Sequence, residues 1–195
     1  MSGSALTDRF DEAVKLASDL HRQQRRKGGE VPYMAHLLQV AGLVLEFGGD
    51  EDAAIAALLH DAVEDQGGAE TDVLIRQRFG DAVANVVLEC SDSAGDPKPP
   101  WSVRKERFIA SIPALSQTAR LVSLADKVHN VRSITADYRQ NGDQAWVHFK
   151  GKREGTLWYY REVAAAYRAT GNEFLIGELE RALHELLILT GESKF

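Results

Sequence analysis

The stretch Ala53–Asp65 reads AAIAALLHDAVED, an apolar run that ends in charged residues. Every residue from Ala53 to Leu59 is apolar, so a helix over this run is apolar on nearly all sides. A helix without a polar face lies buried among other elements. Because the flanking segments also carry helical patterns, this stretch predicts the central helix of an all-α protein.

Charged side chains close the apolar run. His60 and Asp61 follow it directly, and Glu64 and Asp65 lie four residues after them. If the helix continues through Asp65, each pair shares one face. Carboxylates gathered in a small volume raise one another's pKa unless a cation lies among them. A solvated helix C-terminus is the alternative, although acidic side chains oppose the helix dipole there.

Helical patterns continue on both sides of the central run. Thr7 is expected to cap a first helix that extends to the Gly28–Gly29 pair. A second helix is expected over Ala35–Phe47, and Asp50 is expected to cap the central one. Further helices are expected over Thr71–Phe79, Asp81–Asp92, Trp101–Ala110, Ser116–Gln140, Thr156–Arg168 and Glu173–Leu189.

The remaining segments show no strand-like alternation of useful length. Three prolines and a glycine in Ser93–Pro100, SAGDPKPP, indicate a loop that is either a lid or rim of a site or an inert surface segment. The stretch Trp146–Gly155 fits no clear pattern. With no linker or internal repeat in view, the sequence predicts one compact domain of about eight to nine helices over residues 1–195.

The composition is that of an ordinary soluble protein, with 44% hydrophobic and 27% charged residues. A net charge of −6 argues against general nucleic-acid binding. No apolar run approaches the roughly 18 residues of a membrane helix, and the N-terminus lacks the pattern of a secretory signal. The single cysteine, Cys90, is expected to be a buried structural thiol. We therefore expect a cytoplasmic protein without a membrane or nucleic-acid partner.

Two further residues break apolar helix faces. His36 stands at the start of the second helix, where it is either a hydrogen-bonded core histidine or a ligand. Asp126 lies in the long helix among apolar neighbours, with Asn130 one turn further on the same side. A carboxylate on a buried face needs a partner, which is either a metal ion or a buried basic residue.

Together, His36, His60, Asp61 and Asp126 could surround one divalent ion from three different helices. Mixed imidazole and carboxylate ligands suit manganese, iron or zinc better than calcium. Water bound to such an ion has a lowered pKa and can attack phosphorus. Glu64 and Asp65 are close enough in sequence to orient or deprotonate that water.

Basic residues gather in His21–Lys27, HRQQRRK. Arg22, Arg25, Arg26 and Lys27 are four cations in one short segment of an acidic chain. Such a cluster suits phosphate groups, and a solvated helix end is the equal alternative.

These motifs resemble a known family. The order of the four candidate ligands resembles the H…HD…D signature of the HD superfamily. More narrowly, three stretches are similar to the hydrolase domain of RelA/SpoT proteins and to stand-alone small alarmone hydrolases: HRQQRRKGGEVPYMAH, AALLHDAVED and LADKVHN. The likeness covers about Phe10–Arg132 and continues more weakly through Arg168.

The resemblance implies a compact HD-type domain with one Mn²⁺ ion. It implies hydrolysis of the 3′-diphosphate of guanosine tetra- or pentaphosphate, with release of pyrophosphate. The signature residues become the metal ligands, and Glu64 and Asp65 match an acidic pair linked to water activation. Residues expected to contact the nucleotide are Arg26 and Lys27, Asn130, Ser133 and, from the basic cluster, Arg22.

Some positions depart from the family pattern. Leu37 follows His36 where the family usually has proline. The segments 91–101 and 146–162 also differ, so the preference for guanine over adenine stays open. Aromatic side chains of the second segment could stack a base or pack in the core: Trp146, Phe149, Trp158, Tyr159 and Tyr160.

Two other functions stay open on these residues. One is a different HD phosphohydrolase, such as a nucleotidase acting on ordinary mononucleotides. The other is a non-catalytic nucleotide-sensing HD domain, although such domains usually lose a ligand or the acidic pair, and this chain has both. A homo-oligomer is compatible with the sequence.

Overall fold

The computed structural model describes residues 5–91, 99–170 and 172–192, and over these ranges the chain is helical. One isolated bridge, Arg25–Pro32, is the β-type pairing found there. The helices in chain order are α1 (Asp8–Leu20), α2 (Met34–Glu46), α3 (Glu51–Leu59), α4 (Ala62–Asp65), α5 (Ala69–Phe79), α6 (Asp81–Cys90), α7 (Trp101–Ser111), η1 (Ile112–Ala114), α8 (Gln117–Asn141), η2 (Gly142–His148), α9 (Lys152–Arg168) and α10 (Glu173–Leu189).

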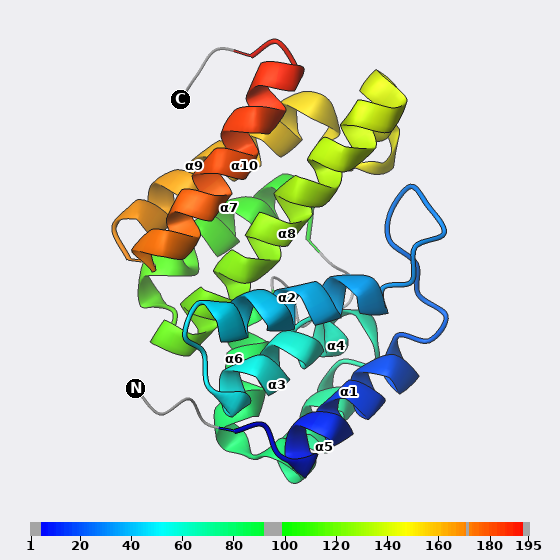
Figure 1. Cartoon of the computed structure of the whole chain (residues 1–195), viewed down its shortest axis with the longest axis vertical. Coiled ribbons are helices and arrows are strands. Elements are labelled where there is room, and N and C mark those ends of the chain that lie inside the picture. Colours follow the sequence, from blue (N-terminus) through cyan, green and yellow to red (C-terminus); the bar gives the residue numbers. More distant parts are fainter. Residues whose placement is uncertain (1–4, 92–98, 171, 193–195) are drawn as a thin grey trace.

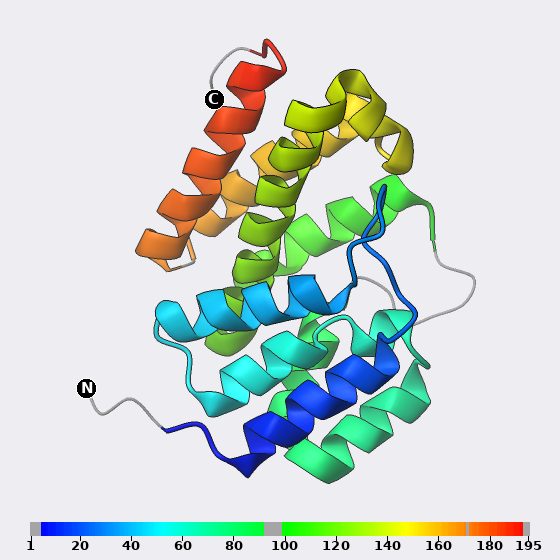
Figure 2. The same cartoon turned by 45° about the vertical axis from the view of Figure 1, so that its right-hand side comes forward.

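The helices form two groups that the longest helix joins. In Figures 1 and 2, α1 and α3 to α6 lie below α2, while α7, α9 and α10 lie above it. Helix α8 runs through both groups and packs on α2, α3, α6 and α10. Among the described residues nine α-helices have nine residues or more, and α4 is a single turn of four. The predicted all-α class and helix number are confirmed.

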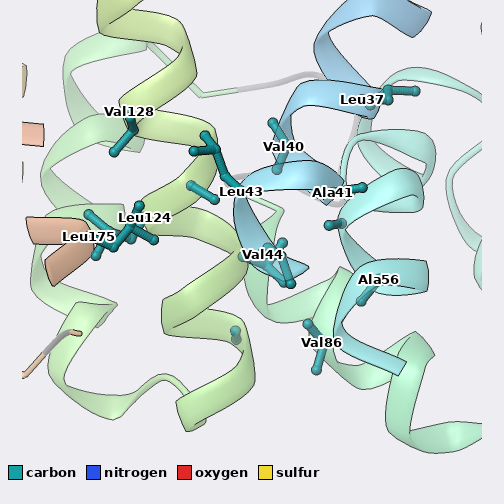
Figure 3. Close-up of a cluster of buried hydrophobic side chains, with 14 of the residues drawn as sticks. Leu37, Val40, Ala41, Leu43, Val44, Ala56, Val86, Leu124, Val128 and Leu175 are labelled. Atoms are coloured by element: carbon teal, nitrogen blue, oxygen red, sulfur yellow. The ribbon is translucent and has the colours of Figure 1, made fainter. Parts of the chain in front are cut away.

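The core forms around α2 and α3. Side chains of Ala54–Leu59 have no exposed surface, so the apolar run is central, as predicted. Figure 3 shows α2 between α8, which carries Leu124 and Val128, and α3, which carries Ala56, with Leu43 extending from α2 toward α8. This packing places the start of α2, the end of α3 and the middle of α8 close together.

Local capping signals define several helix starts. The side chains of Thr7, Asp50 and Ser116 each accept a hydrogen bond from a backbone N–H in the first turn of α1, α3 and α8. Asp81 differs from its predicted role, because it is the first residue of α6 and Gly80, at φ +90°, precedes it as the cap. Glycine adopts this backbone conformation without steric cost.

The first helix is shorter than predicted. It ends at Leu20, and the basic segment belongs to an irregular loop, 21–33. The ring of His21 turns inward, is 2% exposed and stacks on Tyr33 with ring centroids 5.2 Å apart. A backbone hydrogen bond from Tyr33 N to Gln24 O closes the loop. Arg22 therefore lies at a solvated helix end, whereas Arg25, Arg26 and Lys27 belong to the loop that follows it.

Other boundaries also move. Helix α3 ends at Leu59 instead of continuing, and the separate turn α4 begins at Ala62. Helix α6 ends at Cys90, a residue of intermediate exposure whose thiol donates a hydrogen bond to the carbonyl of Ala119, and burial raises the pKa of this thiol. The unassigned stretch contains the end of η2 and the start of α9. Residues 93–98 of the predicted loop lie outside the described residues.

Candidate metal centre

A cavity of about 700 Å³ opens where loop 21–33 meets α2, α4, α7, α8 and the start of α9. All four candidate ligands lie in or beside this cavity. His36 comes from the first turn of α2, His60 and Asp61 from the junction of α3 and α4, and Asp126 from the middle of α8. Packing of three helices thus gathers residues that lie far apart in the sequence.

Three of these side chains have their ligand atoms close together, and Asp61 contacts both histidines. Ligand atoms of His36, His60 and Asp126 all lie within 4.8 Å of one another. Oδ1 of Asp126 is 3.2 Å from Nε2 of His36 and 3.8 Å from Nε2 of His60. Oδ2 of Asp61 is 3.1 Å from Nε2 of His60 and 3.6 Å from Nε2 of His36. The carboxylates of Asp61 and Asp126 therefore both face the Nε2 atoms of the two imidazoles.

Two buried nitrogen atoms point to a cation at this place. His36 and His60 are 1% and 3% exposed, and Nε2 of each makes no hydrogen bond in the structure. Nδ1 of each ring is satisfied, by His129 and by the carbonyl of Ala57 at 2.7 Å. Because buried polar atoms without a hydrogen bond are costly, these Nε2 atoms, which face carboxylate oxygens at 3.1 and 3.2 Å, fit a divalent metal ion well. His36, His60 and Asp126 form a candidate metal site.

The electrostatics of the centre favour positive charge. Burial lowers the pKa of His60, but the carboxylates of Asp61 and Asp126 outweigh it and raise this pKa to about 10. Burial by itself would raise the pKa of both aspartates. His60 nevertheless holds the pKa of Asp61 well below its usual range, and Lys127 does the same for Asp126. Both carboxylates are thus ionised and available to a cation.

Several groups that hold these ligands were missed in the sequence. The hydroxyl of Tyr33 donates to Oδ2 of Asp61, and Nζ of Lys127 donates to Oδ2 of Asp126, each at 2.5 Å. His129 pairs with His36. All three lie next to a candidate ligand in the sequence or a few residues from it. Closeness in sequence to a ligand is therefore the feature that could have identified them. The hydrogen bond from Asn130 to Asp126 agrees with the predicted shared face.

The acidic pair also lines the cavity. Oδ2 of Asp65 accepts a hydrogen bond from Gln24 at 2.8 Å. Oε1 of Glu64 is 3.6 Å from Nη1 of Arg104, a residue of α7 that is 8% exposed. Arg104 was missed as well, although it shares a helix face with Trp101 and Phe108, where a cation is unusual.

Most of the predicted nucleotide contacts lie in the same cavity. Arg26, Lys27, Asn130 and Ser133 all line it, and Nη2 of Arg26 donates to Oδ1 of Asn130 at 2.6 Å. Arg22 is the exception, because it forms an ion pair with Asp19 on the surface and is not among the lining residues. The C-terminal part of the basic cluster, with Arg26 and Lys27, therefore lines the cavity, whereas Arg22 at its N-terminal end does not.

The aromatic residues serve mainly as packing. Trp146, Tyr159 and Tyr160 are buried in the core, and Trp158 packs edge-on against Trp101. Tyr159, Tyr160 and Phe149 also line the cavity wall.

Among the helices of the described ranges, none combines the length and the hydropathy that a membrane-spanning segment requires.

Comparison with known sequences identifies a family and several relatives of this chain. The HD domain family matches residues 13–157. The chain is 41% identical over 126 residues to the guanosine-3′,5′-bis(diphosphate) 3′-pyrophosphohydrolase MESH1 of Xenopus tropicalis, a match that covers 63% of this chain and 68% of the relative. It is 40% identical over 130 residues to a probable guanosine-3′,5′-bis(diphosphate) 3′-pyrophosphohydrolase of Synechocystis, covering 64% of this chain and 16% of that longer protein.

A solved structure has the same fold. It is described as a metazoan ortholog of SpoT that hydrolyses ppGpp and plays a role in starvation responses. The superposition has a TM-score of 0.75 at 29% sequence identity and covers 97% of this chain and 99% of the other.

Proposed function

The chain belongs to the HD domain family and is related to the SpoT hydrolase domain and to MESH1-type proteins; from this premise we propose that it is a ppGpp 3′-pyrophosphohydrolase. In the proposed reaction, the oxygen of water forms a bond to the phosphorus attached to O3′, and the bond from that phosphorus to O3′ breaks. The products are pyrophosphate and GDP, or GTP from the pentaphosphate.

One observation carries the proposal. Two buried histidines direct Nε2 atoms that make no hydrogen bond at the carboxylates of two ionised aspartates. We propose that His36, His60, Asp61 and Asp126 hold one divalent ion, with Mn²⁺ as the expected metal. Such an ion supplies a water of lowered pKa and a positive charge beside the phosphate.

The chain's own residues would do the remaining work. Glu64 and Asp65 lie in the cavity and are oriented by Arg104 and Gln24, so either carboxylate could take a proton from the attacking water. The guanidinium of Arg26 and the ammonium of Lys27 would bind phosphate oxygens.

The rest of the nucleotide would meet polar side chains of α8. Asn130 and Ser133 line the cavity one turn apart, where they could contact the ribose and the inner phosphates. We further propose that residues 1–195 make one HD-type unit. Helices α9 and α10 complete it, because α10 packs along both α8 and α9.

The test is a turnover assay on the manganese-loaded chain. We expect pyrophosphate release from ppGpp and no phosphate release from GMP or AMP. Asp126→Ala should abolish both metal binding and turnover. Turnover of monophosphates alone would instead indicate a nucleotidase, and tight ppGpp binding without any turnover would indicate a sensor. Parallel assays with the adenine analogue of ppGpp would establish the base preference.

A further inference from the structure

We infer that His129 is a positioning residue of the proposed metal site, because it keeps the ring proton of His36 on Nδ1 and leaves Nε2 free to bind a cation. The two Nδ1 atoms are 2.6 Å apart, and the ring centroids are 4.7 Å apart. This inference rests on the metal-binding part of the proposed function and not on the identity of the substrate.

The position of the proton follows from the chemistry of imidazole. A hydrogen bond between two ring nitrogens contains one proton, which one ring donates and the other accepts. If His129 donated, a neutral His36 would carry its proton on Nε2, the atom that lies 3.2 Å from Oδ1 of Asp126. A protonated Nε2 cannot bind a metal. Metal binding therefore requires that His36 donates and that Nδ1 of His129 accepts.

His129 is held in place to accept. It is 7% exposed and lies three residues after Asp126 on α8, so both side chains share one side of that helix. Helix α8 thus supplies one proposed ligand and the hydrogen-bond partner of another ligand, which comes from α2. The contact between α2 and α8 brings this pair together.

His60 provides an internal comparison. Its Nδ1 bonds to the backbone carbonyl of Ala57 at 2.7 Å, and a carbonyl oxygen can only accept. The proton of a neutral His60 is therefore placed on Nδ1 by the backbone. For His36 the same role falls to a side chain, which mutation can replace. Partners of this kind fix the tautomer and the ring orientation of metal-binding histidines.

Two variants test the inference. His129→Leu removes the acceptor, whereas His129→Asn places an amide oxygen near the original Nδ1 atom. We expect His129→Leu to weaken Zn²⁺ and Mn²⁺ binding by about 10- to 100-fold and His129→Asn to restore most of this loss. His184→Leu on α10, away from the cavity, is the matched control and should bind metal as the unmodified chain does.

Nitrogen-15 spectra of the unmodified, Zn²⁺-loaded chain give a second readout that needs no variant. We expect the His36 ring to carry hydrogen on Nδ1. Hydrogen on Nε2 of His36, equal metal affinity of His129→Leu and the unmodified chain, or failure of His129→Asn to recover affinity would each overturn the inference. Metal binding with this tautomer but without ppGpp turnover would leave it standing and remove only the proposed substrate.

Discussion

The hydroxyl of Tyr33 donates a hydrogen bond to Oδ2 of Asp61 over 2.5 Å, which joins the basic loop to the candidate metal centre. The same Tyr33 ring stacks on His21 and lies beneath the guanidinium of Arg26, whose Cζ is 5.6 Å from the ring centroid. Burial, followed by the charge of Asp61, raises the pKa of Tyr33, so the hydroxyl stays protonated and remains a donor. One side chain thus contacts both a proposed ligand and a proposed phosphate-binding group.

Removal of this hydroxyl should weaken the metal site without unfolding the protein. A hydrogen bond to a charged group contributes about 1.5–3 kcal/mol. In the Tyr33→Phe variant, the carboxylate of Asp61 would lose one such hydrogen bond. We expect about a 10- to 100-fold loss of Mn²⁺ affinity, measured by titration with paramagnetic resonance detection. Tyr138→Phe, whose hydroxyl contacts exposed Asp143, is the control. Equal affinity of Tyr33→Phe and the unmodified chain would contradict a role in positioning Asp61.

Removal of the metal should abolish turnover and lower thermal stability together. A ligand that binds only the folded state adds about 2.7 kcal/mol at a hundred times its Kd. We expect the Tm to rise with added Mn²⁺ and to fall after chelation, as followed by circular dichroism. Asp126→Ala should show no Mn²⁺-dependent shift. A shift of the same size in that variant would place the ion elsewhere.

Arg26 and Arg22 should differ sharply, although they are four residues apart. Arg26 lines the cavity and bonds to Asn130, whereas Arg22 pairs with Asp19 at the surface. Loss of a charged hydrogen bond to phosphate costs about 1.5–3 kcal/mol, so Arg26→Ala should lower kcat/KM for ppGpp by about 10- to 100-fold. Arg22→Ala should stay close to the unmodified enzyme. Steady-state kinetics of the two variants decide the matter, and equal losses would show that the whole loop contacts substrate.

Glu51 should make stability depend on pH at the N-terminus. Its Oε1 accepts a hydrogen bond from the backbone N–H of Thr7 at 2.5 Å, and Arg9 lies 3.4 Å from Oε2. The Thr7 hydrogen bond is the main cause that lowers the pKa of Glu51 in the folded protein, and Arg9 adds to it. A lowered folded pKa stabilises the protein above the unfolded pKa, and this contribution is lost as pH falls through the folded pKa.

The Glu51→Gln variant checks this dependence. The free energy of unfolding should be lower than in the unmodified chain near neutral pH, and the difference should shrink as the pH falls below about 4. Urea unfolding across this pH range measures it. Glu12→Gln on the exposed face of α1 serves as the control and should show no such trend. A difference that stays constant with pH would show that the Glu51 carboxylate does not contribute through its charge.

Local sequence determined the helices and most of the candidate ligands. The all-apolar run Ala53–Leu59 is central because that helix has no polar face to expose to solvent. Thr7, Asp50 and Ser116 cap helices because their side chains reach N–H groups only a few residues away. His36 and Asp126 were identifiable because a polar group on an apolar face needs a partner.

The tertiary structure alone decided which partners these groups have. His129 contacts His36 because α2 packs against α8 where these two residues lie. Arg104 contacts Glu64 because α7 and α4 line the same cavity. The different partners of Arg26 and Arg22 likewise depend on packing, because Arg26 meets Asn130 of α8 whereas Arg22 pairs with Asp19 of α1. Helix periodicity and capping act over a few residues, whereas these contacts depend on packing between elements that lie tens of residues apart. Spacing along the chain carries no direct information about that packing.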